Sequence, residues 1–113
     1  AYTVDFDGGE ANPDKYWWPV CEGIAAAAVF HQLSGEGYYE EWYRRLWEFA
    51  ADHFVDARRG GWYCELDAEN RRKDGPWFGK PDVYHTLQST VVPRFRLAAS
   101  VAGSILAGEI PSR

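Results

Sequence analysis

His85 is the residue of this 113-residue chain that is best placed for acid–base chemistry. It comes just after Pro81 and Asp82, where the pattern predicts the first turn of a helix, and it follows a long loop rich in aromatic residues and glycine. A histidine can take up and release a proton near neutral pH, and a helix start holds it rigidly beside the loop. His85 is therefore a candidate general acid or base, with a hydrogen-bonded core histidine as the alternative.

Glu22 is a candidate ligand-binding carboxylate. It follows Cys21 inside an apolar helical pattern and is expected in the first turn of that helix. A carboxylate in that position can bind a polar ligand, or it can simply complement the positive end of the helix. Both interpretations remain open from the sequence.

Four tryptophans provide flat apolar surfaces that suit the C–H face of a sugar ring. They are Trp17, Trp18, Trp62 and Trp77. Each of them can equally belong to the core, where aromatic side chains are common. In the loop before His85, Lys80 and Asp82 either order the chain and bind hydroxyl groups or remain solvated charges. Together these residues support the hypothesis of a sugar-binding site.

Several common reactive motifs are absent from the sequence. There is no glycine-rich phosphate loop, no nucleophile elbow and no C-x-x-C motif. No spacing of His, Cys and Asp is typical of a zinc or iron site. The sequence therefore indicates no metal and no cofactor.

The positions of the candidate residues depend on the elements that carry them. Alternating residues at 2–6 and 62–66 predict strands, and a turn is expected at 67–70. Apolar residues at helical spacing predict helices, the first with Pro19 at its start and the third with Asp82 as its N-cap. The predicted helices span residues 20–33, 38–57, 82–92 and 97–106.

The connections between these helices determine which ends meet. About four residues join the first helix to the second, so the two should be antiparallel neighbours. More than twenty residues join the second to the third, and loops of that length are usually functional. If the helices alternate in direction, the first and third start at the same end. Glu22, His85 and the loop that carries Trp62 and Trp77 are then expected together.

The composition is that of one folded domain, with 46% hydrophobic and 17% aromatic residues. The net charge of −5, from 12 basic and 17 acidic residues, argues against nucleic-acid binding. The longest apolar run, at 24–30, is too short to cross a membrane.

Cys21 and Cys64 are too few for a disulfide framework and are predicted to be buried free thiols. With no signal-peptide pattern at 1–6, we expect a cytoplasmic protein.

Four stretches of the sequence resemble the N-acylglucosamine 2-epimerase superfamily. They are residues 16–22 (YWWPVCE), 61–67 (GWYCELD), 77–85 (WFGKPDVYH) and 91–94 (VVPR). The resemblance covers essentially the whole chain, with the motifs in order and at the right separations. It is strongest to the bacterial aldose–ketose isomerase branch, which includes mannose isomerase and sulfoquinovose isomerase. The 2-epimerase branches typically have a tighter loop before the Tyr-His pair, which favours the isomerase branch.

The resemblance implies an all-α fold, an (α/α)6 barrel with inner and outer rings of helices, on a chain much longer than this one. This sequence resembles only the C-terminal part. We therefore expect residues 1–113 to be the C-terminal portion of one barrel domain, with three to four helices and a short β-hairpin. The helices at 20–33 and 82–92 would belong to the inner ring, and the helix at 38–57 to the outer ring.

The resemblance also implies a mechanism. Two histidines shuttle a proton between C1 and C2 of a monosaccharide through a cis-enediol intermediate, without a cofactor. His85 matches one of them, and the other belongs to a part of the family sequence that is absent here. Glu22 matches a substrate-binding carboxylate, while Trp18 and Trp77 match aromatic walls of the pocket. The chain alone is therefore expected to be inactive, and its bare apolar helix faces are expected to drive self-association.

Three alternatives to an aldose–ketose isomerase remain. A sugar 2-epimerase of the same superfamily would be separated from it by product analysis. A non-catalytic helical carbohydrate-binding or interaction module would use His85 and Glu22 only to pack or to hold a ligand. An (α/α)6 glycoside hydrolase would need two suitably spaced carboxylates, and only Glu22 is well placed.

Overall fold

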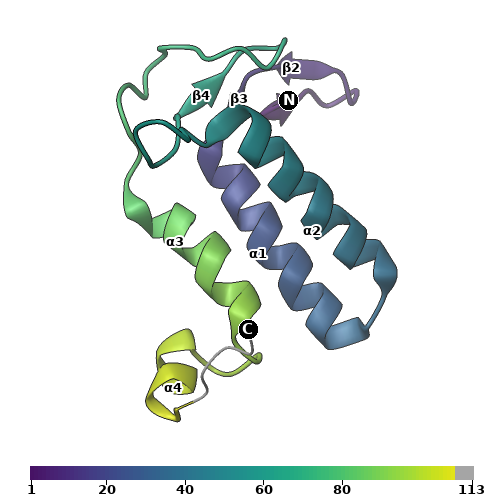
Figure 1. The fold of residues 1–113 in the computed structure, drawn as a ribbon. Helices are drawn as coiled ribbons and strands as arrows, with labels where there is room; N and C mark the ends of the chain where they lie inside the picture. The colour runs from purple at the N-terminus through teal and green to yellow at the C-terminus, as the bar shows by residue number, and fades with distance from the viewer. Residues whose placement is uncertain (109–113) are drawn as a thin grey trace.

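The computed structural model describes residues 1–108, and three of its helices lie side by side. α1 (Trp17–Ser34) lies between α2 (Gly37–Phe49) and α3 (Val83–Val91) and contacts both (Figure 1). α2 runs antiparallel to α1, whereas α3 begins at the same end as α1 (Figure 1). The predicted alternation of the helices is therefore confirmed. A short fourth helix, α4 (Val101–Leu106), lies beyond the far end of α3.

Small residues let α1 approach its neighbours closely. Ala25, Ala27 and Ala28 are buried, whereas Ala26 between them is exposed. A Cβ atom added at Gly23 would lie 3.1 Å from Cδ1 of Leu46 in α2, which is closer than most real contacts. The Leu46 side chain would therefore have to move by a few tenths of an ångström to admit a side chain at this position.

α1 starts earlier than predicted. The backbone N–H of Trp17 donates to the carbonyl oxygen of Cys64 at 3.1 Å, so the preceding strand leads directly into the helix. Pro19 is the third residue of α1, where its missing N–H costs no hydrogen bond because the first four N–H groups of a helix have no partner within it. The helix ends at Ser34, before Gly35, whose φ of 72° is a left-handed conformation that glycine adopts readily.

The second helix ends earlier than predicted and in a different geometry. α2 continues into a π-helical turn, η1 (Ala50–Phe54), in which the N–H of Val55 donates to the oxygen of Ala50 at 2.9 Å. Val55 then becomes extended and pairs with Trp62. The last three residues of the predicted helix therefore belong to a loop, because pairing across the Gly60-Gly61 turn outweighs a weak local helical preference.

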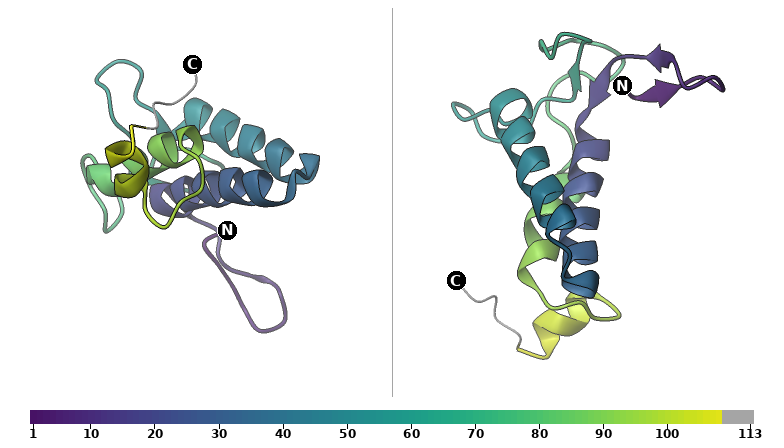
Figure 2. Two further views of the ribbon diagram at one scale, coloured as in Figure 1. Left: turned by 90° about the horizontal axis from the view of Figure 1, so that it is seen from below. Right: turned by 90° about the vertical axis from the view of Figure 1, so that its right-hand side faces the viewer.

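The strands are shorter than predicted, and two of the four were not predicted. β1 (Thr3–Val4) and β2 (Glu10–Asn12) form an antiparallel hairpin that projects from the helices (Figure 2). β3 (Lys15–Tyr16) pairs antiparallel with β4 (Glu65–Leu66). This pairing joins the start of α1 to the long connection between α2 and α3. The two predicted strands contain β1 and β4. Neither β2 nor β3 has an alternating pattern long enough to predict it.

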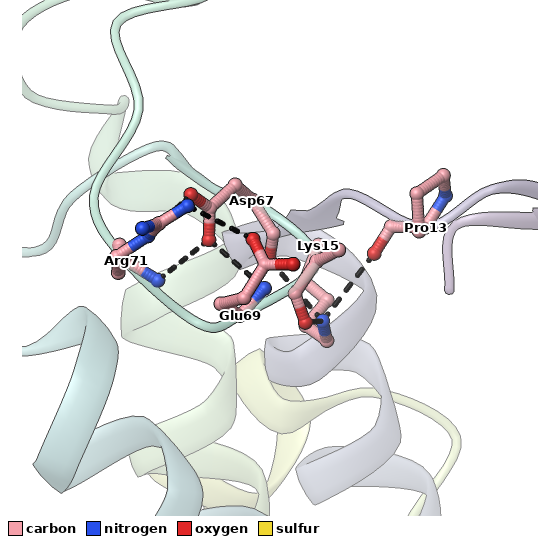
Figure 3. A network of polar contacts seen from close by, with 6 residues as sticks. Pro13, Lys15, Asp67, Glu69 and Arg71 are labelled. Carbon is pink, nitrogen blue, oxygen red and sulfur yellow. Dashed lines mark hydrogen bonds and ion pairs between the residues drawn. The ribbon is translucent and has the colours of Figure 1, made fainter.

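Polar contacts fix the turn that follows β4 (Figure 3). Nζ of Lys15 donates to the carbonyl oxygens of Pro13, Asp67 and Ala68, at 3.3, 3.2 and 2.9 Å. Nε of Arg71 donates to Oδ2 of Asp67 at 2.9 Å. The predicted turn is therefore present, and a lysine of β3 ties it to the chain directly before α1.

α3 follows the prediction, whereas α4 is shorter than predicted. Oδ1 of Asp82 accepts a hydrogen bond from the N–H of Tyr84 at 2.8 Å, which confirms Asp82 as the N-cap. A 3-10 turn, η2 (Val92–Arg94), follows α3. α4 begins only after Ser100, whose Oγ accepts a hydrogen bond from the N–H of Gly103 at 3.0 Å. The cap at Ser100 therefore sets the start of α4 later than the apolar pattern suggested.

The molecule is more open than a closed domain of this length. Its radius of gyration is 15.5 Å, whereas a compact domain of similar size has about 13 Å. Phe30 and Leu33 of α1 and Val83 and Leu87 of α3 leave half or more of their surface exposed. Apolar helix faces are therefore uncovered in this structure. None of the helices among residues 1–108 combines the length and apolar character that crossing a membrane requires.

Phe54 is the largest completely buried side chain of the described part, and its ring packs against Trp62 with centroids 6.3 Å apart. Replacing Phe54 with Ala should lower the free energy of unfolding by about 3–5 kcal/mol, because it removes apolar contacts and leaves a cavity. The control is Phe78→Ala at an 82% exposed position, for which we expect a change below about 0.5 kcal/mol. Urea unfolding followed by circular dichroism measures both, and equal losses would contradict this core.

Candidate active site

The structure brings His85 and Glu22 into direct contact. Nδ1 of His85 lies 2.7 Å from Oε1 of Glu22. His85 is in the first turn of α3, as predicted, and Asp82 fixes that turn by capping it. α1 and α3 begin at the same end (Figure 1), and there two residues 63 positions apart come into contact. The predicted convergence of these two side chains is confirmed.

Glu22 lies in the second turn of α1 rather than the first, because the helix already begins at Trp17. The first turn of α1 contains no acidic residue, so complementing the positive end of the helix does not explain Glu22. Its carboxylate accepts the hydrogen bond from His85 instead. The interpretation of Glu22 as a helix-terminal charge is therefore wrong.

The contact with Glu22 determines which nitrogen of His85 carries hydrogen. An ionised carboxylate offers only acceptor atoms, so Nδ1 donates to it and Nε2 remains for proton exchange with a ligand. A proton taken up at Nε2 would give the ring a positive charge that faces the carboxylate. The His85 side chain is 26% exposed and the Glu22 side chain 45%, so both can be reached from outside. The pair can accept a proton from a bound molecule or return one to it.

Tryptophan rings flank His85. The ring of Trp18 is tilted against the imidazole with centroids 6.1 Å apart, and the ring of Trp17 meets it edge to face at 6.4 Å. Trp77 contacts Trp17 at 5.7 Å and is 53% exposed. The structure therefore places Trp18 beside His85 and connects Trp77 to it through Trp17.

Two tryptophans of the predicted aromatic group belong to the core. Trp62 is 7% exposed and packs against Phe54 and Trp47, so its assignment to a ligand surface is wrong. Trp17 is 4% exposed, and its Nε1 has no hydrogen-bond acceptor among residues 1–108. A buried indole N–H normally has an acceptor, so one is expected from outside this part of the chain.

A cavity of about 260 Å³ adjoins this group and is lined largely by the loop before α3, including Trp77. A larger groove of about 480 Å³ lies toward the other end of α1, where His31 contributes to its wall. Neither cavity is lined by Glu22 or His85. The acid–base chemistry, rather than the size of a groove, therefore identifies the candidate site.

Lys80 orders the loop before α3, which is one of the two roles considered for it. Its Nζ donates to Oδ2 of Asp56 at 2.7 Å and lies 4.3 Å from the centroid of the Tyr63 ring. The Lys80 ammonium, and after it the Tyr63 hydroxyl, hold the pKa of the Asp56 carboxyl well below its usual range. Nothing in the sequence indicates this pair, because 24 residues separate its members and Asp56 belongs to none of the recognised stretches.

Both cysteines are buried and unpaired, as predicted. Burial raises the pKa of the Cys21 thiol to about 12, and it also raises the pKa of Cys64. The reducing, cytoplasmic environment expected from these thiols stays a prediction. Within residues 1–108, no three side chains of His, Cys, Asp or Glu are grouped in a way that could hold a metal ion.

Comparison with known proteins identifies the family. Residues 1–89 match the N-acylglucosamine 2-epimerase (GlcNAc 2-epimerase) family. The chain is 45% identical over 105 residues to a D-mannose isomerase of Thermobifida fusca, a match that covers 92% of this chain and 26% of that protein. It is 29% identical over 83 residues to a cellobiose 2-epimerase of Ruminococcus albus, covering 68% of this chain and 21% of that protein. The chain spans about a quarter of the length of these curated relatives.

A solved structure agrees with the sequence comparison. A crystal structure of D-mannose isomerase superposes with a TM-score of 0.71 at 34% identity, over 78% of this chain and 23% of that chain. The open helical layer is thus part of a barrel from a superfamily of sugar isomerases and epimerases. The chain belongs to the N-acylglucosamine 2-epimerase family. The predicted all-α class and the assignment to part of an (α/α)6 barrel are confirmed.

Cys21 should resist alkylation in the folded protein. A pKa of about 12 in place of 9.0 leaves the thiol with roughly a thousandfold less thiolate at pH 8, and the side chain is fully buried. We expect iodoacetamide to label Cys21 only after unfolding in urea, as measured by peptide mass spectrometry. A cysteine introduced by Ser34→Cys, at an exposed position of the same helix, is the labelled control. Equal labelling of Cys21 with and without urea would contradict its burial.

Proposed function

We propose that the complete protein is a sugar isomerase that interconverts a mannose-type aldose and its ketose, with His85 as one of two proton-transferring groups. The contact between His85 and Glu22 is the observation that carries this proposal. The 45% identity to a D-mannose isomerase supports it. The proposed substrate is a monosaccharide, and residues 1–113 are the proposed C-terminal portion of one (α/α)6-barrel domain.

The reaction moves one proton between two carbons of the open-chain sugar. A base removes the proton from C2 of the aldose while the oxygen on C1 gains a proton, and a cis-enediol forms. The oxygen on C2 then loses its proton while C1 gains one, which gives the ketose. Atoms and electrons balance without an external oxidant or reductant. Nε2 of His85 exchanges protons with one pair of atoms, either the two carbons or their two oxygens, and a second histidine, expected elsewhere in the complete protein, serves the other pair.

Glu22 supports His85 and also contributes to binding. By accepting the hydrogen bond from Nδ1, its carboxylate fixes the tautomer and the orientation of the imidazole. The Glu22 side chain is exposed enough to accept a hydrogen bond from a sugar hydroxyl as well. Trp18 and Trp77 provide apolar walls for the C–H faces of the sugar. In this proposal the four residues together form one side of a pocket.

A 2-epimerase is the second candidate, and the 29% identity to a cellobiose 2-epimerase over 68% of the chain favours it. Such an enzyme would share the removal of the C2 proton but would return a proton to the opposite face of C2 instead of C1. The products therefore differ, because an isomerase forms a ketose and an epimerase forms the C2 epimer. Chromatography of the products formed from mannose separates the two candidates.

Replacing His85 with Ala in the complete protein should lower kcat by about 10²–10⁴-fold, because it removes a general acid–base group. Turnover of mannose in deuterated water, with deuterium incorporation followed by NMR, measures this loss. Sugar binding, measured by calorimetry, should change far less. His53→Ala removes a histidine of η1 outside the site and is the control. A variant His85→Ala with wild-type turnover would rule out the proposed role, and a wild type without turnover would favour a binding module.

The 113-residue chain on its own should be inactive and should associate. One imidazole cannot perform both proton transfers, and the exposed apolar side chains of α1 and α3 favour contact between copies. The measurements are mannose turnover by the purified chain and its mass by light scattering. Turnover that persists after removal of any longer protein would contradict the expected inactivity. A compact monomer across a range of concentrations would contradict the expected association.

A further inference from the structure

We propose that the ion pair between Lys80 and Asp56 is a latch that positions the Trp77 segment, residues 76–82, for substrate binding. Lys80 is then a positioning residue, because it acts through Trp77 and not on the reacting atoms. This inference rests on the proposed sugar site and adds to it a residue outside the acid–base pair.

Asp56 is a fixed anchor that does not need Lys80 to stay in place. It is 4% exposed, and its Oδ1 accepts hydrogen bonds from the N–H groups of Arg58 and Arg59, both at 3.1 Å. Its backbone N–H donates to the carbonyl oxygen of Gly61 at 2.9 Å. The loop that holds Asp56 therefore keeps its shape through its own hydrogen bonds.

The charged contact itself is short and partly buried. Nζ of Lys80 lies 2.7 Å from Oδ2 of Asp56, whose side chain is 5% exposed, while the Lys80 side chain is 40% exposed. The ammonium also lies over the ring of Tyr63, at 4.3 Å from its centroid. The lowered pKa of Asp56 keeps its carboxyl ionised at neutral and mildly acidic pH. The Asp56 side of the latch is therefore charged at neutral pH.

The other contacts of the Trp77 segment are weaker. Sγ of Cys64 donates to the carbonyl oxygen of Gly79 at 3.6 Å, and a thiol is a weak donor. Trp77 touches Trp17 edge to face but is 53% exposed, and Phe78 is 82% exposed. The hydrogen bond of Asp82 to the N–H of Tyr84 ties only the end of the segment to α3. The ion pair is therefore the strongest polar contact that the structure gives residues 76–81, and its loss would free Trp77 to move.

α3 is held by different contacts, so the latch can affect Trp77 without displacing His85. Asp82 caps the helix through the N–H of Tyr84, and α3 packs along α1. His85 itself is bonded to Glu22. Loss of the latch should therefore weaken sugar binding while the proton-transferring pair stays assembled, which predicts a change in KM rather than in kcat.

The experiment uses the complete protein labelled with 5-fluorotryptophan, with the Trp77 resonance assigned by its absence in Trp77→Phe. In Lys80→Met we expect the fluorine resonance of Trp77 to shift or broaden, KM for mannose to rise about threefold or more, and kcat to stay within about twofold. Lys80→Arg keeps the charge and should restore KM and the resonance toward wild type. Arg72→Met is the matched control, because Arg72 also lies over the Tyr63 ring, at 3.6 Å, without contacting the Trp77 segment.

The fluorine spectrum separates this inference from the proposed function, because it requires no turnover. A Trp77 resonance that moves in Lys80→Met in a protein without isomerase activity would support the latch and reject the function. An unchanged Trp77 resonance in Lys80→Met, or equal changes in Arg72→Met, would overturn the latch. A loss of kcat at constant KM would overturn it as well. If Lys80→Met does not fold, Lys80→Gln, which removes the charge but keeps a polar end, gives the same comparison.

Discussion

The hydrogen bond between Glu22 and His85 depends on close, parallel packing of α1 against α3. The two residues are 63 positions apart, and a separation of 2.7 Å requires both helices to start at one end and to approach closely. Cys21 of α1 and Ser89 of α3 are completely buried and interact with each other, which brings the two backbones together one helical turn from the pair. The acid–base pair is thus a property of helix packing, and any change that separates the helices separates the pair.

The long connection between η1 and α3 is the second feature that shapes the site. Three contacts order it: the pairing of Val55 with Trp62 and the ion pair of Lys80 with Asp56, both within the connection, and the pairing of β4 with β3, which ties it to the chain before α1. Without these contacts, a loop of this length could adopt many conformations, and Trp77 would have no single position. Because they are present, Trp77 has a defined position against Trp17, whose ring also contacts His85.

The openness of the structure agrees with the family to which the chain belongs. The chain covers 26% of a D-mannose isomerase. A quarter of a barrel leaves bare the helix faces that pack against the rest of the barrel. The exposed sides of α1 and α3 and the unpaired indole N–H of Trp17 are the local signs of this division. They lie on the same helices as the acid–base pair, so the remaining wall of a pocket is expected from the rest of a barrel.

The sequence by itself determined the helices, their direction and the pairing of Glu22 with His85. Helical periodicity and the cap at Asp82 are local signals, and the short and long connections decide which helix ends meet. Tertiary structure decided the rest. Trp62 and Trp18 look alike in sequence, yet the bridge to Val55 buries Trp62 while Trp18 stays beside the imidazole. The π-helical end of α2, the strands β2 and β3, and the pair of Lys80 with Asp56 depend on contacts between distant residues, for which local sequence carries no signal.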